Sequence, residues 1–194
     1  REIGMMSKYG GGTSVYLGNI RPRGAEISTG GTADGPVHYA RIYDTVVDVC
    51  KQSEARRGAC ASYLPVEHPD IEEFLDIGTE GNPIQNLQYG VTVTNDWMNE
   101  MIEGDRVKRK IWAKIIQRRS EFGFPYIMFK DNSNNQSPYK ELGLEITASN
   151  LCSEIQLPTD SYNSFVCCLG SINVLHWDEI KETDAIQTYV YFLN

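Results

Sequence analysis

Three side chains of different chemistry occupy alternate positions in one short stretch of the sequence. Asn150, Cys152 and Glu154 supply a carboxamide, a thiol and a carboxylate within the run Ser-Asn-Leu-Cys-Ser-Glu-Ile-Gln-Leu-Pro-Thr at 149–159. In an extended segment they would share one face, because side chains alternate with a period of two. Burying an amide and a carboxylate costs several kcal/mol unless each finds a partner. The pattern therefore leaves two interpretations open: three groups that converge on a ligand, or a solvent-facing edge strand that carries a cysteine.

The cysteines and histidines do not form a metal-binding or disulfide pattern. The five cysteines are irregularly spaced, no CxxC pair occurs, and none of the three histidines lies at metal-ligand spacing from a cysteine. We therefore expect no metal site and no disulfide framework of the secreted kind. A Cys-His hydrolase stays open on spacing, since its residues would meet only in the folded chain. Three cysteines are expected to be small buried hydrophobes: Cys50, Cys60 and Cys168.

Composition and charge narrow the class of protein. The chain has 194 residues, 41% of them hydrophobic and 23% charged, which is typical of a globular protein with a core. Its formal net charge of −8 argues against a nucleic-acid surface, which needs clustered positive charge. No apolar run is long enough to predict a membrane span, and the first residues have no secretory-signal pattern. We expect both ends to be cut through a larger fold, because no Met opens the chain and an amphipathic pattern runs to its last residues.

The hydrophobic pattern predicts the elements that must position these groups. Helices are predicted over 2–9, 36–50, 69–76, 96–102 with Asn95 as the cap, 107–121 and 184–194. Strands are predicted over 13–20, 59–64, 88–94 and 126–129, and strand-like composition returns over 165–174. The stretches 21–35, 51–58 and 131–138 are predicted to be loops. This alternation of strands and helices indicates an α/β layer built on parallel strands.

Several stretches taken in order resemble one enzyme family. Besides 149–159 they are 7–12, 19–24, 50–59, 123–131 and 165–173, so they are spread along the whole chain. The set is similar to the large, catalytic subunit of class I ribonucleotide reductase, and the Asn-Leu-Cys-x-Glu-Ile wording is its most specific part. The resemblance implies a ten-stranded α/β barrel made of two half-barrels, with a finger loop through its centre. Residues 1–194 would then be a piece of that barrel domain, about its first half plus the finger loop, and inactive alone.

The resemblance also assigns roles to the residues of the finger loop. Cys152 is similar to the cysteine that becomes a thiyl radical and takes the C3′ hydrogen of the ribose. Glu154 resembles the general base on the 3′-hydroxyl, and Asn150 the amide that orients the ribose; both would bind substrate. Cys167 resembles one half of the dithiol that reduces the 2′ position, while Cys168 is assigned to packing. The other half of the dithiol would lie before residue 1, and a tyrosine pair that relays the radical would lie after residue 194.

Two loops resemble the family's regulatory loops for deoxynucleoside triphosphate effectors. Arg21 matches an arginine that contacts effector phosphates, a contact that suits a guanidinium, and Ile27 and Ser28 lie in the same loop. Gln52 and Arg56 match the loop that carries effector identity to the substrate base. The effector-binding set implied by the resemblance is therefore Arg21, Ile27, Ser28, Gln52 and Arg56.

Two further stretches, one that differs from the family and one that matches it, bear on nucleotide binding. Ser53-Glu54 stands where many members have Gly-Gly, so backbone freedom is reduced and the effector rules of better-known members are in doubt. Gly11 and Gly12 match a turn near the substrate phosphates, where the lack of a side chain permits close approach. The alternative for the glycines is a tight turn between a helix and a strand.

The partners follow from the same resemblance. It implies a metal-containing small subunit that supplies the radical, a homodimer of large subunits, a thioredoxin- or glutaredoxin-type reductant and a nucleotide substrate. It also implies ATP or deoxynucleoside triphosphate effectors, no cofactor bound by this chain, no nucleic acid, no membrane, and a cytoplasmic location. Two alternatives stay open: the cobalamin-dependent class, which shares the barrel and the radical cysteine, and a non-catalytic nucleotide-binding or assembly half of a split reductase.

Overall fold

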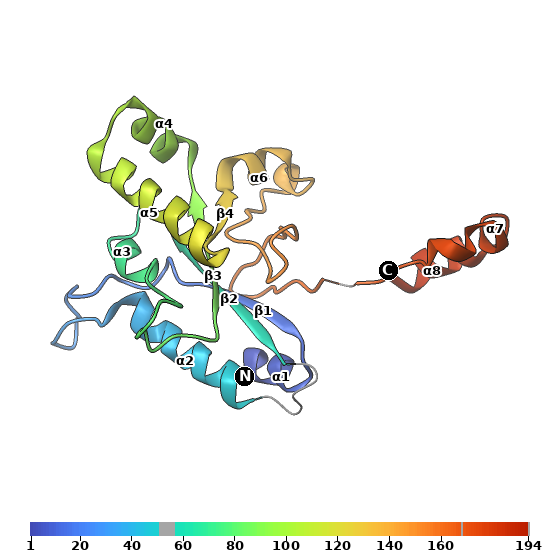
Figure 1. Ribbon diagram of the computed structural model, residues 1–194, viewed down its shortest axis with the longest axis horizontal. Helices are drawn as coiled ribbons and strands as arrows, with labels where there is room; N and C mark the ends of the chain where they lie inside the picture. Colours follow the sequence, from blue (N-terminus) through green and yellow to red (C-terminus); the bar gives the residue numbers. More distant parts are fainter. Residues whose placement is uncertain (51–56, 168, 194) are drawn as a thin grey trace.

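A sheet of four parallel strands forms the centre of the protein (Figure 1). The computed structural model describes residues 1–50, 57–167 and 169–193. The strands stand in sequence order, β1 (Gly12–Tyr16), β2 (Ala59–Pro65), β3 (Gln88–Val93) and β4 (Tyr126–Phe129), and each pairs in parallel with the next. Two parallel strands that are neighbours in the sheet must be joined by a crossover connection, and along this chain each connection contains at least one helix. The predicted α/β layer is confirmed.

Capping side chains and glycines mark where two of the longer helices begin and end. They are α1 (Glu2–Lys8), α2 (Gly35–Val49), α3 (Ile71–Phe74), α4 (Asn95–Glu103), α5 (Arg106–Phe122), α6 (Lys130–Gln136), α7 (Trp177–Ile180) and α8 (Ala185–Leu193). The Thr94 hydroxyl caps α4 by accepting from the Trp97 N–H, so Asn95, the expected cap, is the first helical residue instead. The Asp105 carboxylate caps α5, and Gly123 ends it with a φ of 78°.

The hydrophobic core lies between the sheet and the helices that cover one of its faces. Strand residues such as Leu64, Tyr89 and Val91 pack in one cluster with Ala40 of α2 and Ile115 of α5. The Phe74 and Tyr89 rings meet edge to face with centroids 5.7 Å apart. Because side chains alternate along a strand, the intervening strand residues lie on the opposite face.

Two elements predicted within residues 1–138 differ from the structure. The strand expected over 13–20 ends at Tyr16, because the chain then turns, with the Ile20 N–H donating to the Leu17 carbonyl. The loop expected over 131–138 is helix α6 up to Gln136, although it has no apolar stripe. The Asn134 side chain holds that helix to the following chain, since its amide donates to the Ile146 carbonyl and its carbonyl accepts from the Ile146 N–H.

The carboxyl-terminal part of the chain lies apart from the sheet (Figure 1). The strand-like stretch 165–174 is irregular in its described residues, with a 3-10 turn at Val174–His176, so the strand expectation is wrong there. The expected terminal helix is present as α8, and the Tyr189 hydroxyl packs against Gly170. Among the described residues, no helix has both the length and the apolar character to cross a membrane.

Candidate active site on the inner face of the sheet

The face of the sheet opposite the helices carries a row of tyrosines interrupted by a glycine. The strand register places Tyr16 beside Tyr63, Tyr63 beside Gly90, and Gly90 beside Tyr126. We call this side the inner face, defined by Gly12, Ser14, Tyr16, Ala59, Ala61, Tyr63, Gln88, Gly90 and Tyr126. Apart from the tyrosines and Gln88 these residues are small, so the face has room for a segment lying against it.

The segment that occupies this face begins at Ser149. The Tyr63 hydroxyl and the Ser149 hydroxyl are hydrogen-bonded, and both residues are buried, with 0% and 3% of their surface exposed. A β-carbon at Gly90 would overlap the Tyr63 ring, so the glycine gives that ring its space. Burial raises the pKa of the Tyr63 hydroxyl, and the hydrogen bond to Ser149 lowers it by a smaller amount. The phenol therefore stays protonated at neutral pH.

Residues 150–155 form a closed loop rather than an extended strand. The Asn150 N–H donates to the Ile155 carbonyl at 2.8 Å, and the Ile155 N–H donates to the Cys152 carbonyl at 2.9 Å. The expectation of three side chains on one face of an extended segment is therefore wrong. The two ends of the loop are bonded to each other, with Cys152 and Glu154 between them, and the convergence of the three side chains on a ligand stays a prediction. Cys152 is half-buried and Glu154 is exposed.

Asn150 has its acceptor occupied and its donor available. The side-chain oxygen accepts from the Leu151 N–H at 2.7 Å, while the amide nitrogen makes no hydrogen bond to the described part of the chain. The Ser149 hydroxyl donates to the Asn150 carbonyl at 2.9 Å. An amide held by its oxygen presents two N–H donors, which suit the hydroxyl groups of a sugar.

Each of the three glycines between α1 and β1, Gly10, Gly11 and Gly12, is in a different local environment. Gly10 has a φ of 70°, so the left-handed conformation belongs to it and not to Gly11 or Gly12. The Gly11 N–H donates to the Met6 carbonyl at 2.8 Å, which closes the turn after α1. Gly12 lies under Leu151, and a β-carbon there would overlap the leucine side chain. The tight-turn interpretation is thus confirmed for 10–11, while a phosphate contact stays a prediction.

The other cysteines differ in burial. Cys60 on β2 has no exposed surface, and burial raises the pKa of its thiol, so it is the small buried hydrophobe that was expected. Cys50 is only half-buried, which is less than expected. Cys167 is half-buried in the irregular chain after the loop, and its approach to Cys152 stays a prediction. Cys168 lies outside the described residues.

The predicted first regulatory loop is an ordered hairpin. The Gly24 N–H donates to the Ala33 carbonyl at 2.8 Å, Glu26 and Thr32 form an antiparallel bridge, and the Ile27 N–H donates to the Gly31 carbonyl at 3.0 Å. We call residues 21–33 the effector hairpin, after the role predicted for it. It brings Arg21, Ile27 and Ser28 into one unit, with the Arg21 guanidinium donating to the Glu26 carbonyl at 3.1 Å. Gln52 and Arg56 of the second loop lie outside the described residues.

The base of this hairpin is fixed to the chain around α3. The Arg23 N–H donates to the Asp70 carboxylate at 2.8 Å, and the Arg23 guanidinium pairs with Glu73 at 2.6 Å. Buried His68 accepts from the Asp70 N–H at 3.1 Å through Nδ1, so its Nε2 carries the proton that is donated to the Ile20 carbonyl at 2.9 Å. The hairpin therefore enters and leaves the fold at fixed points.

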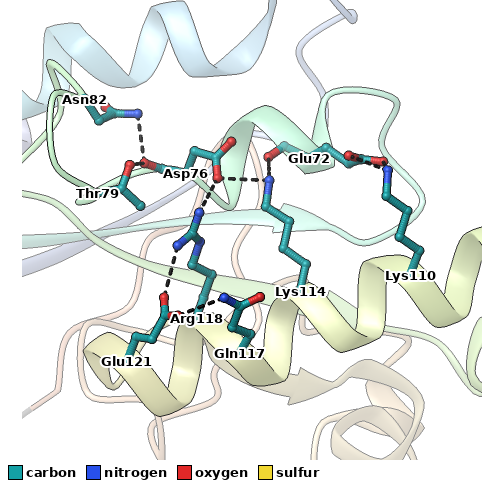
Figure 2. A network of polar contacts seen from close by, with 9 residues as sticks. All are labelled: Glu72, Asp76, Thr79, Asn82, Lys110, Lys114, Gln117, Arg118 and Glu121. Atoms are coloured by element: carbon teal, nitrogen blue, oxygen red, sulfur yellow. Dashed lines mark hydrogen bonds and ion pairs between the residues drawn. The ribbon is translucent and has the colours of Figure 1, made fainter.

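The same α3 region is joined to α5 by a polar network (Figure 2). Asp76 accepts from Lys114 at 2.9 Å and from Arg118 at 2.8 Å, and Lys110 pairs with Glu72. Burial raises the pKa of Asp76, but the hydrogen bonds and charges of Lys114 and Arg118 outweigh it and hold the pKa below its ordinary value of 3.8. Lys110, Lys114 and Arg118 of α5 are thus paired with carboxylates of the α3 region.

No group of three or more His, Cys, Asp or Glu side chains within the described residues is arranged to hold a metal ion. The loop carries a thiol, an exposed carboxylate and an amide donor, and the residue before it, Ser149, is bonded to the sheet.

The fold is a parallel α/β layer with a cysteine-bearing loop on its inner face, and comparison with known proteins identifies its family. The chain belongs to the ribonucleotide reductase family, whose barrel-domain model matches residues 1–108 and 103–194. The expected fold, part of the family's α/β barrel, is confirmed by this match.

Individual relatives give the same result. The solved structure of a class Id ribonucleotide reductase alpha subunit from Actinobacillus ureae superposes with a TM-score of 0.87 at 51% identity, covering 99% of this chain and 36% of that one. The ribonucleoside-diphosphate reductase subunit alpha of Bacillus subtilis (strain 168) is 29% identical over 92% of this chain and 34% of its own length. A vitamin B12-dependent ribonucleoside-diphosphate reductase of Thermoplasma acidophilum is 33% identical over 94% of this chain and 27% of its own length. The chain therefore spans roughly a third of the length of these relatives.

Proposed function

We propose that this chain forms the radical-cysteine half of the catalytic subunit of a class I ribonucleoside-diphosphate reductase. The observation that carries the proposal is the closed loop on the inner face, which holds the Asn-Leu-Cys-x-Glu-Ile sequence in a chain of the reductase family. The reaction converts a ribonucleotide and a dithiol into a deoxyribonucleotide, a disulfide and water.

Each loop residue has a role that its chemistry fits. A thiyl radical at Cys152 takes the C3′ hydrogen, and Glu154 accepts the proton of the 3′-hydroxyl. The 2′-hydroxyl leaves as water after it receives a proton from the dithiol that contains Cys167. The Asn150 amide donates to the ribose hydroxyls, consistent with its occupied oxygen and available nitrogen. Cys167 and a second cysteine supply the two electrons and become a disulfide. Cys152 then returns the hydrogen to C3′, which restores the thiyl radical.

Class I is favoured over the cobalamin-dependent alternative by sequence identity. The class Id alpha subunit is 51% identical, against 33% for the vitamin B12-dependent relative. In class I the radical comes from a metal-containing small subunit, so we propose that subunit, a second large subunit and a thioredoxin- or glutaredoxin-type reductant as partners. A dithiol-driven reaction fits the reducing cytoplasm, which we propose as its location.

Regulation is assigned to the effector hairpin and the loop that contains Gln52 and Arg56. Arg21 would bind effector phosphates, with Ile27 and Ser28 near the tip contacting the nucleoside. Gly11 and Gly12 would lie close to the substrate phosphates. The ordered hydrogen bonds of the hairpin support this assignment, because a preorganised loop loses less entropy when it binds a ligand.

The test is deoxynucleotide formation by the full-length chain that contains these residues. It would be mixed with its small subunit, a dithiol reductant, an effector and either CDP or ADP. Formation of dCDP or dADP that needs both the small subunit and the dithiol supports the proposal. Turnover that needs added adenosylcobalamin and no small subunit would support the cobalamin-dependent class. Nucleotide binding without turnover under every condition would support a non-catalytic module.

A further inference from the structure

We propose that Tyr63 and Ser149 form a hydroxyl latch that positions the Asn150–Cys152–Glu154 loop on the inner face. This inference rests on the proposed function and adds two positioning residues to it, neither of which carries out a step of the reaction. The starting observation is that a buried hydroxyl of β2 is bonded to the residue immediately before the loop.

The direction of the hydrogen bonds follows from counting protons. A serine hydroxyl has one hydrogen, and that of Ser149 is donated to the Asn150 carbonyl at 2.9 Å. The Tyr63 hydroxyl must therefore donate to the Ser149 oxygen. The result is a chain of two bonds that runs from Tyr63 to the backbone of Asn150, and bonds in such a chain polarise and strengthen each other.

The sheet provides space for this latch. Tyr63 stands next to Gly90 in the β2–β3 register, and its ring occupies the volume that any side chain at Gly90 would fill. Tyr126 of β4 lies beside Gly90 on its other side. Its hydroxyl donates to the Gln88 side chain at 3.1 Å, so it does not compete for Ser149. The glycine thus allows one tyrosine of the row to reach the loop.

A second contact holds the loop on the other side of Asn150. Leu151 packs directly on Gly12 of β1, where no side chain intervenes. Asn150 is therefore bracketed by a polar contact to β2 through Ser149 and an apolar contact to β1 through Leu151. With both neighbours fixed and the loop closed by the Asn150–Ile155 bond, the places of Cys152 and Glu154 are determined by the sheet.

The competing explanation is that the bond only stabilises the fold. A buried hydrogen bond stabilises the folded state wherever it lies. The two explanations differ in kinetics, because misplacing reacting groups lowers kcat even when the protein remains folded and substrate still binds.

The experiment uses Tyr63→Phe, Ser149→Ala and the double variant in the full-length chain with its small subunit. The matched control is Tyr89→Phe, which removes a buried phenol hydroxyl from the helix-covered face, where it has no partner among the described residues. We expect each latch variant to lower kcat roughly tenfold with KM changed less than about twofold. The double variant should be no worse than the worse single one, because both lose the same bond. Tyr89→Phe should keep the kcat of the parent.

Hydrogen–deuterium exchange supplies a readout that does not depend on turnover. The Asn150 and Ile155 amides close the loop, so they should exchange faster in Tyr63→Phe and unchanged in Tyr89→Phe, with exchange in β2 and β3 unaffected. The latch is overturned if kcat and these two amides match the parent, or if exchange rises across the whole sheet along with the loss of kcat. An inactive parent would instead refute the proposed function, while the exchange result would still decide whether Tyr63 holds the loop.

Discussion

Gly90 stands directly beside Tyr63 across the β2–β3 pair, and its missing side chain is what lets the Tyr63 ring lie over β3. A β-carbon at Gly90 would also come within 2.8 Å of two further ring atoms. Because Tyr63 is fully buried, its ring has little freedom to move aside. The glycine is therefore a packing requirement of the site.

We expect Gly90→Ala to destabilise the protein by about 1–3 kcal/mol, the usual cost of overpacking a core. The free energy of unfolding from urea denaturation would measure it. Gly4→Ala is the control, since a β-carbon there meets only ordinary contacts at 3.6 Å and alanine favours the α1 helix. Equal stability of Gly90→Ala and the parent would show that the ring can relocate.

Most of the sheet could be predicted from sequence, because its strands are short apolar runs bounded by polar or glycine residues. Helix α6 could not, since Lys130–Gln136 is almost wholly polar and is held by side-chain bonds from Asn134. Residue alternation also misrepresented 150–154, because one backbone bond from Asn150 to Ile155 closes a loop that no periodic pattern reveals.

Only part of the candidate site could be predicted from the sequence. Its chemical residues could be named from their types and order, whereas Tyr63 resembles any other apolar residue of a buried strand. A signal did exist, since an isolated glycine within a strand, here Gly90, marks a close approach. Its partner Ser149 could not be inferred, because the pairing spans 86 positions in the sequence.

Cys152→Ser in the full-length chain should abolish deoxynucleotide formation while folding and effector binding remain. Serine has nearly the same shape, but its O–H bond is too strong to relay a radical. The measurement is dCDP formation with the small subunit and dithiol present. Cys50→Ser is the control, a half-buried thiol on the edge of α2 that should tolerate the change. Turnover in Cys152→Ser above the assay background would refute the assigned role.

Cys167→Ser should separate hydrogen abstraction at C3′ from reduction at C2′. Substrate binding and radical formation at Cys152 should survive, so we expect 3′-hydrogen exchange to persist. Repeated turnover with a dithiol reductant should fail, because the electron-donating pair lacks one thiol. Product measured against enzyme concentration checks this outcome. Normal multiple turnover would show that Cys167 has a structural role.

Asp76→Asn should reduce stability at neutral pH by up to about 1 kcal/mol, because the pairs with Lys114 and Arg118 are partly exposed. The pKa of Asp76 is lowered in the folded state, so the unfolded state binds more protons in acid. The contribution is complete above the ordinary value of 3.8 and is lost as the pH falls through the lower folded pKa. The difference between parent and variant in urea denaturation should therefore be largest near neutral pH and shrink below about pH 4. A difference that stays constant down to acid would show that the ion pairs do not cause it.

Glu73→Gln should weaken effector binding by releasing the base of the effector hairpin. The 2.6 Å pair between Arg23 and Glu73 joins the hairpin to α3, and the neutral amide keeps the size of the side chain without its charge. We expect the half-saturating concentration of a deoxynucleoside triphosphate to rise roughly threefold, and less at high salt because an exposed pair is screened. Glu72→Gln is the control, since Glu72 also lies on α3 but its more exposed pair is with Lys110 of α5, away from the hairpin. If both variants shift effector binding equally, the effect comes from the charge of α3 in general and the Arg23–Glu73 pair does not fix the hairpin.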